Sequence, residues 1–199
     1  MDAASLQAQG RFHVHQKLTM MVNRYQVFAD DGAGNPGELV AFAEQKRMKL
    51  REHVTLFADE AKRAVLAEFR ARKALDVSSG YDVVTGEGSP IGVFSKQFAS
   101  SLLRSTWQLE QPGHDPVLIT ERSRALAVFR RVWSFLPWIG EFPFLWKYHF
   151  DWLIGPTKIG SFDKVTRLQD HYVVTVDDET LDRRLVIAQA VALDALQSR

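Results

Sequence analysis

The fold of this sequence is decided by the run LVIAQAVAL at residues 185–193. Asp177, Asp178 and Glu179 precede it, and acidic side chains cap helices and stabilise their first turn. We therefore expect a helix that begins at these acids and continues to about Leu196. It has almost no polar face, and a helix that is apolar all round must be buried on all sides.

The chain before this helix is dominated by short segments in which apolar and polar residues alternate. Within residues 11–18, Phe12, Val14 and Leu18 alternate with polar side chains, which is the period of a half-buried strand. Residues 61–73 have the composition of a helix, but they alternate in the same way and we assign them to a strand. The other predicted strands are 23–29, 39–45, 53–58, 81–84, 91–98, 105–110, 117–120, 149–154, 158–164 and 171–176.

A closed barrel is the architecture that suits both features. Two similar hairpins, at 25–46 and 81–96, suggest an antiparallel meander that closes on itself. The interior of such a barrel would bury the terminal helix on every side, so the expected fold class is mainly β with some helix (α+β). A second, short amphipathic helix is expected at 123–135, where Leu126, Phe129 and Trp133 share one face.

Composition limits the classes of protein to which the chain can belong. It has 199 residues, of which 46% are hydrophobic and 25% charged, so disorder as the main state is excluded. The net charge of +1 gives no overall attraction to nucleic acid, and no nucleic-acid partner is expected. The absence of cysteine removes thiolate nucleophiles and cysteine zinc sites, and it fits a reducing compartment.

The start of the chain has none of the features of a signal peptide. Residues 1–10 carry an acid where a signal peptide has bases, with no apolar run behind it, so we expect a disordered segment and a cytoplasmic protein. The apolar runs are far shorter than the ~20 residues that span a bilayer. Residues 11–199 are expected to form a single domain, with 123–147 as a helical and aromatic insertion.

Several short segments carry a family resemblance that extends from about Phe12 to Leu196. These segments are Gln16-Lys17, Asn23-Arg24-Tyr25-Gln26-Val27, Tyr81-Asp82-Val83, Gly88, Ile91-Gly92, Arg104-Ser105-Thr106-Trp107 and Ala188-Gln189-Ala190-Val191-Ala192-Leu193-Asp194. In this order, together with the terminal apolar helix, they resemble the tubby C-terminal-like superfamily. The resemblance is greatest to its LURP-one-related and phospholipid scramblase branches.

The resemblance implies a closed barrel of about twelve antiparallel strands threaded by the terminal helix. For function it implies less, because members range from phosphoinositide binding to proposed lipid scrambling. The scramblase calcium segment has no counterpart, since residues 176–179 are explained as a helix cap. The tubby phosphoinositide motif is not matched, so no binding residue is carried over from it.

Signatures of catalysis and of metal binding are missing. The sequence has no nucleophile elbow, phosphate-binding loop, metalloprotease motif or dinucleotide fingerprint, which favours a protein that is not an enzyme and needs no cofactor. His13 and His15 share one strand face but have no nearby carboxylate, so a solvated face is favoured over a metal site. Asp30 and Asp31 lie in a glycine-rich loop without the oxygen spacing of a calcium site, which favours a polar hairpin loop.

Positive charge is concentrated between residues 46 and 73, where nine bases and four acids give a local charge of +5. Bases near an anionic membrane contribute about 1 kcal/mol each to binding. The alternative is a solvated outer face of the barrel. The candidate residues for binding a lipid headgroup are Lys46, Arg47, Lys49, Arg51, Lys62, Arg63, Arg70 and Arg72.

Aromatic residues are concentrated between residues 133 and 152, which contain four of the five tryptophans. Trp and Tyr settle at headgroup depth in membranes, and the neighbouring bases favour such a contact. Alternatively, these residues cover an open end of the barrel or form a contact with a protein partner or a second copy. The candidate contact residues are Trp133, Trp138, Phe142, Phe144 and Trp146.

The expected function is that of a non-catalytic binding or regulatory module, peripheral to a membrane and associated with anionic phospholipid. The alternative is a scaffold that binds a protein partner or an apolar small molecule in a pocket of the barrel, with no role at a membrane. The sequence leaves the ligand and the oligomeric state open.

Overall fold

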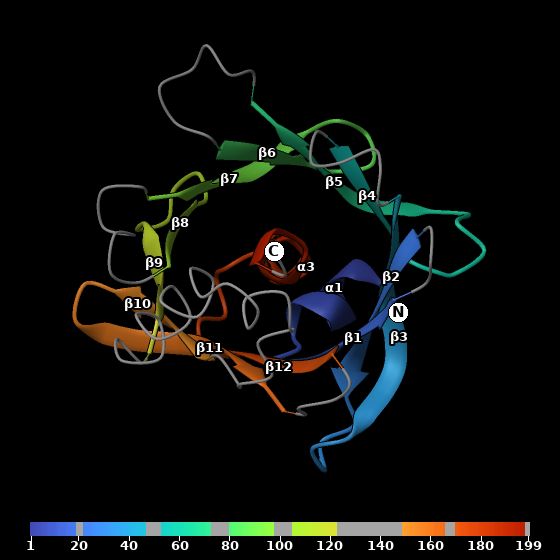
Figure 1. The fold of residues 1–199 in the computed structure, drawn as a ribbon, viewed down its shortest axis with the longest axis horizontal. Coiled ribbons are helices and arrows are strands. Elements are labelled where there is room, and N and C mark those ends of the chain that lie inside the picture. The colour runs from blue at the N-terminus through green and yellow to red at the C-terminus, as the bar shows by residue number, and fades with distance from the viewer. Residues whose placement is uncertain are drawn as a thin grey trace, which may run out of the picture.

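The structure is a computed structural model that describes residues 1–18, 22–46, 53–72, 80–97, 105–122, 149–165 and 170–197. Within these residues, twelve strands form a closed barrel around a helix (Figure 1). The helices are α1 (Ala3–Gln7) and α3 (Arg183–Gln197). The strands are β1 (Arg11–Leu18), β2 (Val22–Asp30), β3 (Pro36–Lys46), β4 (His53–Phe57), β5 (Val65–Ala71), β6 (Gly80–Val84), β7 (Pro90–Lys96), β8 (Thr106–Glu110), β9 (Val117–Glu121), β10 (His149–Ile154), β11 (Thr157–Lys164) and β12 (Asp170–Val176).

The strands follow one another round the barrel in chain order, each antiparallel to the next. The barrel closes where β1 pairs with β12, with Phe12 opposite Val174 and Val14 opposite Tyr172. The expected closed antiparallel barrel is therefore confirmed. The strand assignment within 61–73 is confirmed as well, because β5 runs from Val65 to Ala71.

Period-two alternation sends one set of side chains into the barrel. Phe12 and Val14 on β1 are fully buried, and Phe12 lies opposite Ala29 of β2 and Val174 of β12, which are buried too. Each large apolar side chain that is removed from water contributes about 1.5–3 kcal/mol. The core is thus the set of inward-facing residues of the wall together with the helix inside it.

Helix α3 lies at the centre of the barrel (Figure 1). Every residue from Leu185 to Leu193 is at most 1% exposed, as a helix without a polar face requires. The wall approaches it closely at Gly92 of β7, where a Cβ atom would lie 2.7 Å from Cδ2 of Leu185. The predicted enclosure of the terminal helix is confirmed.

The helix begins later than the sequence suggested. Its first residue is Arg183, and Asp182 is the cap: its carboxylate accepts the Arg184 N–H at 2.8 Å and its carbonyl accepts the Val186 N–H at 3.1 Å. The prediction of a cap at residues 177–179 is therefore wrong. Asp178 instead closes a turn by accepting the Thr180 N–H at 2.8 Å, which leaves no helical turn before Asp182.

The expected disorder at residues 1–10 also differs from the structure. Helix α1 is capped by Asp2, which accepts the Ser5 N–H at 2.8 Å, and Leu6 is only 5% exposed. The Gln7 amide donates to the carbonyl of Leu181 at 3.0 Å, which ties α1 to the start of α3.

The single-domain assignment stays a prediction, and the helix expected at 123–135 lies outside the described residues. Neither described helix is long and apolar enough to cross a membrane.

Candidate functional site

The barrel has two ends that differ in chemistry. We call the end where α3 begins the entry rim; there β2, β4, β6, β8, β10 and β12 finish. We call the end where α3 finishes the exit rim; there β1, β3, β5, β7, β9 and β11 finish. Each candidate residue can be placed relative to these two rims.

The described members of the predicted basic set lie near both rims. Lys62 and Arg63 lie in the turn between β4 and β5 at the entry rim, whereas Arg70 and Arg72 lie near the exit rim. The two pairs are about 20 Å apart along β5, because a strand rises about 3.3 Å per residue. Lys46 ends β3 at the exit rim, and the remaining members Arg47, Lys49 and Arg51 lie outside the described residues.

Acidic neighbours neutralise the four bases whose side chains are described. Lys62 bonds to Glu44, and this hydrogen bond lowers the pKa of the Glu44 carboxyl. The remaining ion pairs join Arg63 to Asp59 at 3.5 Å, Arg70 to Glu68 at 2.6 Å and Arg72 to Asp82 at 2.8 Å. Exposed pairs of this kind contribute about 0–1 kcal/mol to stability. These four bases therefore do not form a shared anion site.

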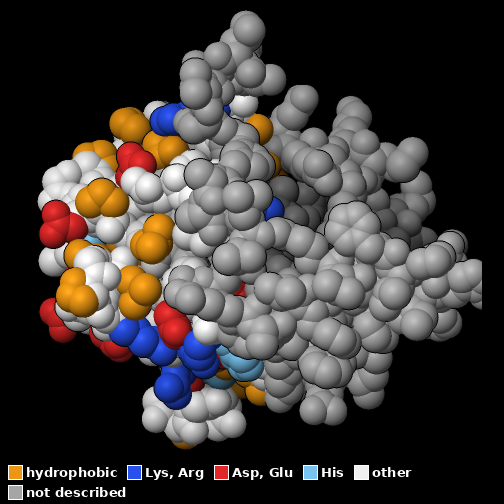
Figure 2. Space-filling view, turned by 60° about the vertical axis from the view of Figure 1, so that its left-hand side comes forward, with side chains coloured by type: hydrophobic (Ala, Val, Ile, Leu, Met, Phe, Trp, Pro, Cys, Tyr) orange, Lys and Arg blue, Asp and Glu red, His pale blue; other side chains and the backbone are white. Residues whose placement is uncertain are grey.

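Opposite charges are paired elsewhere on the wall too. Arg122 Nη2 lies 2.7 Å from Asp151 and 3.1 Å from Asp163. Lys158 adds a further contact to Asp151 at 2.7 Å. Figure 2 shows basic and acidic side chains close together on the described surface. This part of the wall therefore alternates in charge.

The predicted aromatic contact residues Trp133, Trp138, Phe142, Phe144 and Trp146 lie outside the described residues. The end of the same aromatic stretch is described, because Phe150 and Trp152 belong to β10. Both are 0% exposed, so this end of the stretch belongs to the core of the barrel.

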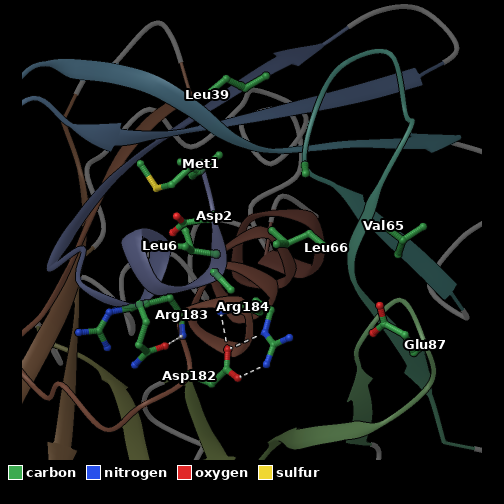
Figure 3. Close-up of a pocket in the computed structure, with 14 residues that line it drawn as sticks. Met1, Asp2, Leu6, Leu39, Val65, Leu66, Glu87, Asp182, Arg183 and Arg184 are labelled. Atoms are coloured by element: carbon green, nitrogen blue, oxygen red, sulfur yellow. Dashed lines mark hydrogen bonds and ion pairs between the residues drawn. The ribbon is translucent and has the colours of Figure 1, made fainter.

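A pocket of about 240 Å³ opens at the entry rim beside the start of α3 (Figure 3). Its apolar lining includes Leu6 of α1, Leu39 of β3 and Leu66 of β5. Figure 3 shows the carboxylate of Asp182 facing the guanidinium of Arg184 at one wall, and these groups are 2.6 Å apart. The pocket is smaller than the 300–1,000 Å³ of most small-molecule sites, and its lining combines these leucines with charged side chains such as Glu87 and Arg184.

Arg183, the first residue of α3, connects the start of the helix to neighbouring backbone segments beside the pocket. It is 2% exposed, and its guanidinium donates to the backbone carbonyls of Gln9, Asp178 and Leu181 at 2.6, 2.7 and 2.8 Å. Burial lowers its pKa. Since the guanidinium is committed to three carbonyls, its role is to fasten the helix start to the N-terminal segment.

A histidine cluster lies on the outer face of the wall where β1 meets β12. His13 Nδ1 is 3.2 Å from His171 Nε2, and His13 Nε2 is 2.8 Å from the Asp30 carboxylate. The rings of His15 and His171 pack with centroids 4.2 Å apart. His13 is 2% exposed, so the expectation of a solvated face is wrong for it, because its ring is enclosed and bonded on both sides.

Sequence reasoning missed this cluster because His171 is 158 residues from His13 and only barrel closure brings them together.

The expected hairpin loop is confirmed: Asp30 accepts the N–H of Gly32, and Asp31 accepts that of Ala33, each at 2.8 Å. In the described parts of the chain, no group of three or more histidine or acidic side chains is arranged to hold a metal ion.

The closed barrel of twelve described strands around a helix is the architecture implied by the resemblance to the tubby C-terminal-like superfamily. The sequence model of the LURP-one-related family matches residues 39–194, so the chain belongs to that family. No curated protein and no solved structure matches the chain significantly.

Proposed function

We propose that this protein is a non-catalytic binding module that associates with anionic phospholipid through the exit rim of its barrel. Topology supports the proposal. The chain that carries Arg47, Lys49 and Arg51 joins β3 to β4, and both strands meet the exit rim. The chain that carries the predicted aromatic residues joins β9 to β10, which meet the same rim. Contacts with a membrane interface combine basic residues, which attract anionic lipid, with aromatic residues, which settle at headgroup depth. The two segments that carry such residues join strands at the same rim.

The ion pairs narrow the set of residues that would bind the lipid. Lys62, Arg63, Arg70 and Arg72 already have acidic partners, so the proposal assigns the attraction to the bases that follow β3. Each of these contributes about 1 kcal/mol near an anionic surface. Loss of Arg47, Lys49 and Arg51 together should therefore weaken binding by roughly 100-fold.

Vesicle sedimentation tests this proposal with a control from the same basic stretch. Wild type should bind phosphatidylcholine vesicles that contain phosphatidylserine, and salt should weaken the binding because screening acts on exposed charges. The triple variant Arg47→Gln, Lys49→Gln, Arg51→Gln should lose it, whereas Lys62→Gln with Arg63→Gln, at the entry rim, should retain it. Absence of wild-type binding at low ionic strength, or equal loss in both variants, would refute the proposal.

A second candidate function follows from the entry-rim pocket, which suits an apolar group from a partner or a small molecule. The probe 1-anilinonaphthalene-8-sulfonate should bind in the absence of vesicles and fluoresce. Leu66→Trp should abolish the signal by filling the pocket, whereas Leu118→Trp, at an exposed position of β9 outside the pocket, should not. No signal from wild type, or a signal that Leu66→Trp leaves unchanged, would exclude this candidate.

A further inference from the structure

Gln189 is the one polar residue of the run from Leu185 to Leu193, and it is 0% exposed. Neither its amide nitrogen nor its amide oxygen has a hydrogen-bond partner among the described residues. Buried amides in proteins are almost always paired, either with other protein groups or with ordered water. The amide of Gln189 therefore needs a partner that the described protein groups do not supply.

Two tryptophans of the inner wall share this property. Trp107 of β8 is 2% exposed and Trp152 of β10 is 0% exposed, and neither indole nitrogen has a partner within the described part of the chain. Ile119 of β9 lies opposite Trp107 on one side and opposite Trp152 on the other. The two tryptophans thus stand at one level, two strands or about 10 Å apart, on the inner face of the wall.

The rotation of α3 is fixed by two contacts on opposite sides of the barrel. Leu185 faces β7, because a Cβ atom on Gly92 would lie 2.7 Å from its Cδ2. Asp194 faces β12, because Tyr172 Oη donates a hydrogen bond to its carboxylate. These residues are nine positions apart, which is half a turn at about 100° per residue. The two contacts therefore agree on how α3 is oriented in the barrel.

This orientation turns Gln189 toward the tryptophans. Gln189 follows Leu185 by about one turn, which adds about 40° of rotation and about 6 Å toward the exit rim. Ala188 and Ala192 lie on the opposite side of Leu185 around the helix axis from Gln189. We place this side toward β5, because the α3 backbone comes close to β5 and only small side chains fit there. β5 and β8 lie on opposite sides of β7 (Figure 1). From the helical geometry, Gln189 therefore turns toward β8, the strand of Trp107.

We infer that this part of the barrel interior is a binding site for ordered water, which bridges the Gln189 amide to the indole N–H groups of Trp107 and Trp152. Each indole is a donor that needs an acceptor, and the amide oxygen is an acceptor that needs a donor. A water molecule supplies both roles at once. The amide and the indoles are neutral, so a neutral partner such as water satisfies them without burying a further charge.

Thermal unfolding of the variant Gln189→Met distinguishes a Gln189 amide that is hydrogen-bonded to water from one that has no partner. If water satisfies the amide, the variant loses those bonds and leaves the indoles unpaired, so its Tm should fall by about 2–6 °C. The control Leu193→Met, a volume-conserving change in the same buried helix, reports the cost of a methionine inside the barrel. A Tm for Gln189→Met that is unchanged or higher than that of wild type, after this correction, would overturn the inference.

NMR of the folded protein labelled with ¹⁵N in its tryptophans observes the water directly. Trp107→Phe and Trp152→Phe assign the two indole signals. Both indole protons should show nuclear Overhauser cross-peaks to water bound for longer than a nanosecond, and Gln189→Met should remove or weaken both. A wild-type protein with no such cross-peak, or with a cross-peak at only one indole, would overturn the bridging site.

Discussion

Acid should destabilise the barrel through the histidine cluster at the β1–β12 junction. Burial, followed by the neighbouring rings of His15 and His13, lowers the pKa of His171 from 6.5 to about 4. Burial also lowers the pKa of His15. In addition, His13 Nδ1 and His171 Nε2 are 3.2 Å apart, so one of them must accept the proton that the other donates. Protonation of both rings would place two N–H groups against each other.

The sign and the size of the effect follow from linkage. A histidine whose pKa is lower in the folded protein binds its proton more readily when unfolded, so stability falls as the pH drops below 6.5 and levels off near pH 4. The full shift in the pKa of His171 corresponds to ~3 kcal/mol of unfolding free energy. Because the ring is half-buried and partly screened by water, we expect about 1–2 kcal/mol.

Urea unfolding at pH 7 and pH 5 measures this loss. The variant His171→Gln keeps a hydrogen-bonding group but cannot be protonated, so its loss of stability between the two pH values should be smaller than that of wild type by about 1 kcal/mol. His53→Gln, at an exposed position on β4, is the control and should lose as much as wild type does. An acid-induced loss in His171→Gln as large as that of wild type would refute this account of the cluster.

Three further substitutions test the core and the start of α3. Ala190→Asp places an unpaired charge at a position that is 0% exposed and should abolish folding, as seen by circular dichroism; stability near that of wild type would contradict the threaded barrel. Asp182→Ala removes the cap of α3 and should cost about 1 kcal/mol in urea unfolding; no change would mean that the cap contributes nothing. Gly92→Ala puts a Cβ atom 2.4 Å from the Glu110 carbonyl and should cost about 1–3 kcal/mol by the same assay, and an unaffected variant would show that β7 shifts freely.

The barrel could be predicted from the sequence because burial imposes a period on each strand and a uniform apolar surface on the helix. Phe12 and Val14 alternate since only one face of β1 is inside, and residues 185–193 lack alternation since every face is inside. The start of α3 was harder to predict because three consecutive acids look like a helix cap. Only the turn that Asp178 makes with Thr180 shows that the helix has not yet begun.

The candidate sites were less predictable because their partners come from distant strands. The charge count over residues 46–73 omits Glu44 and Asp82, which lie outside that stretch and neutralise Lys62 and Arg72. Helix α1 was missed since one buried leucine in a helix of five residues leaves no periodic signal.

Chain order imposes a sequence of events during synthesis. All twelve described strands precede α3, so the ribosome delivers the wall of the barrel before the element that fills it. Chains emerge at about 5–20 residues per second, so the strands wait for seconds with their apolar inner faces uncovered. β1 also waits for its partner β12 throughout that time and keeps an unpaired edge. The nascent chain is therefore most exposed to aggregation before α3 emerges.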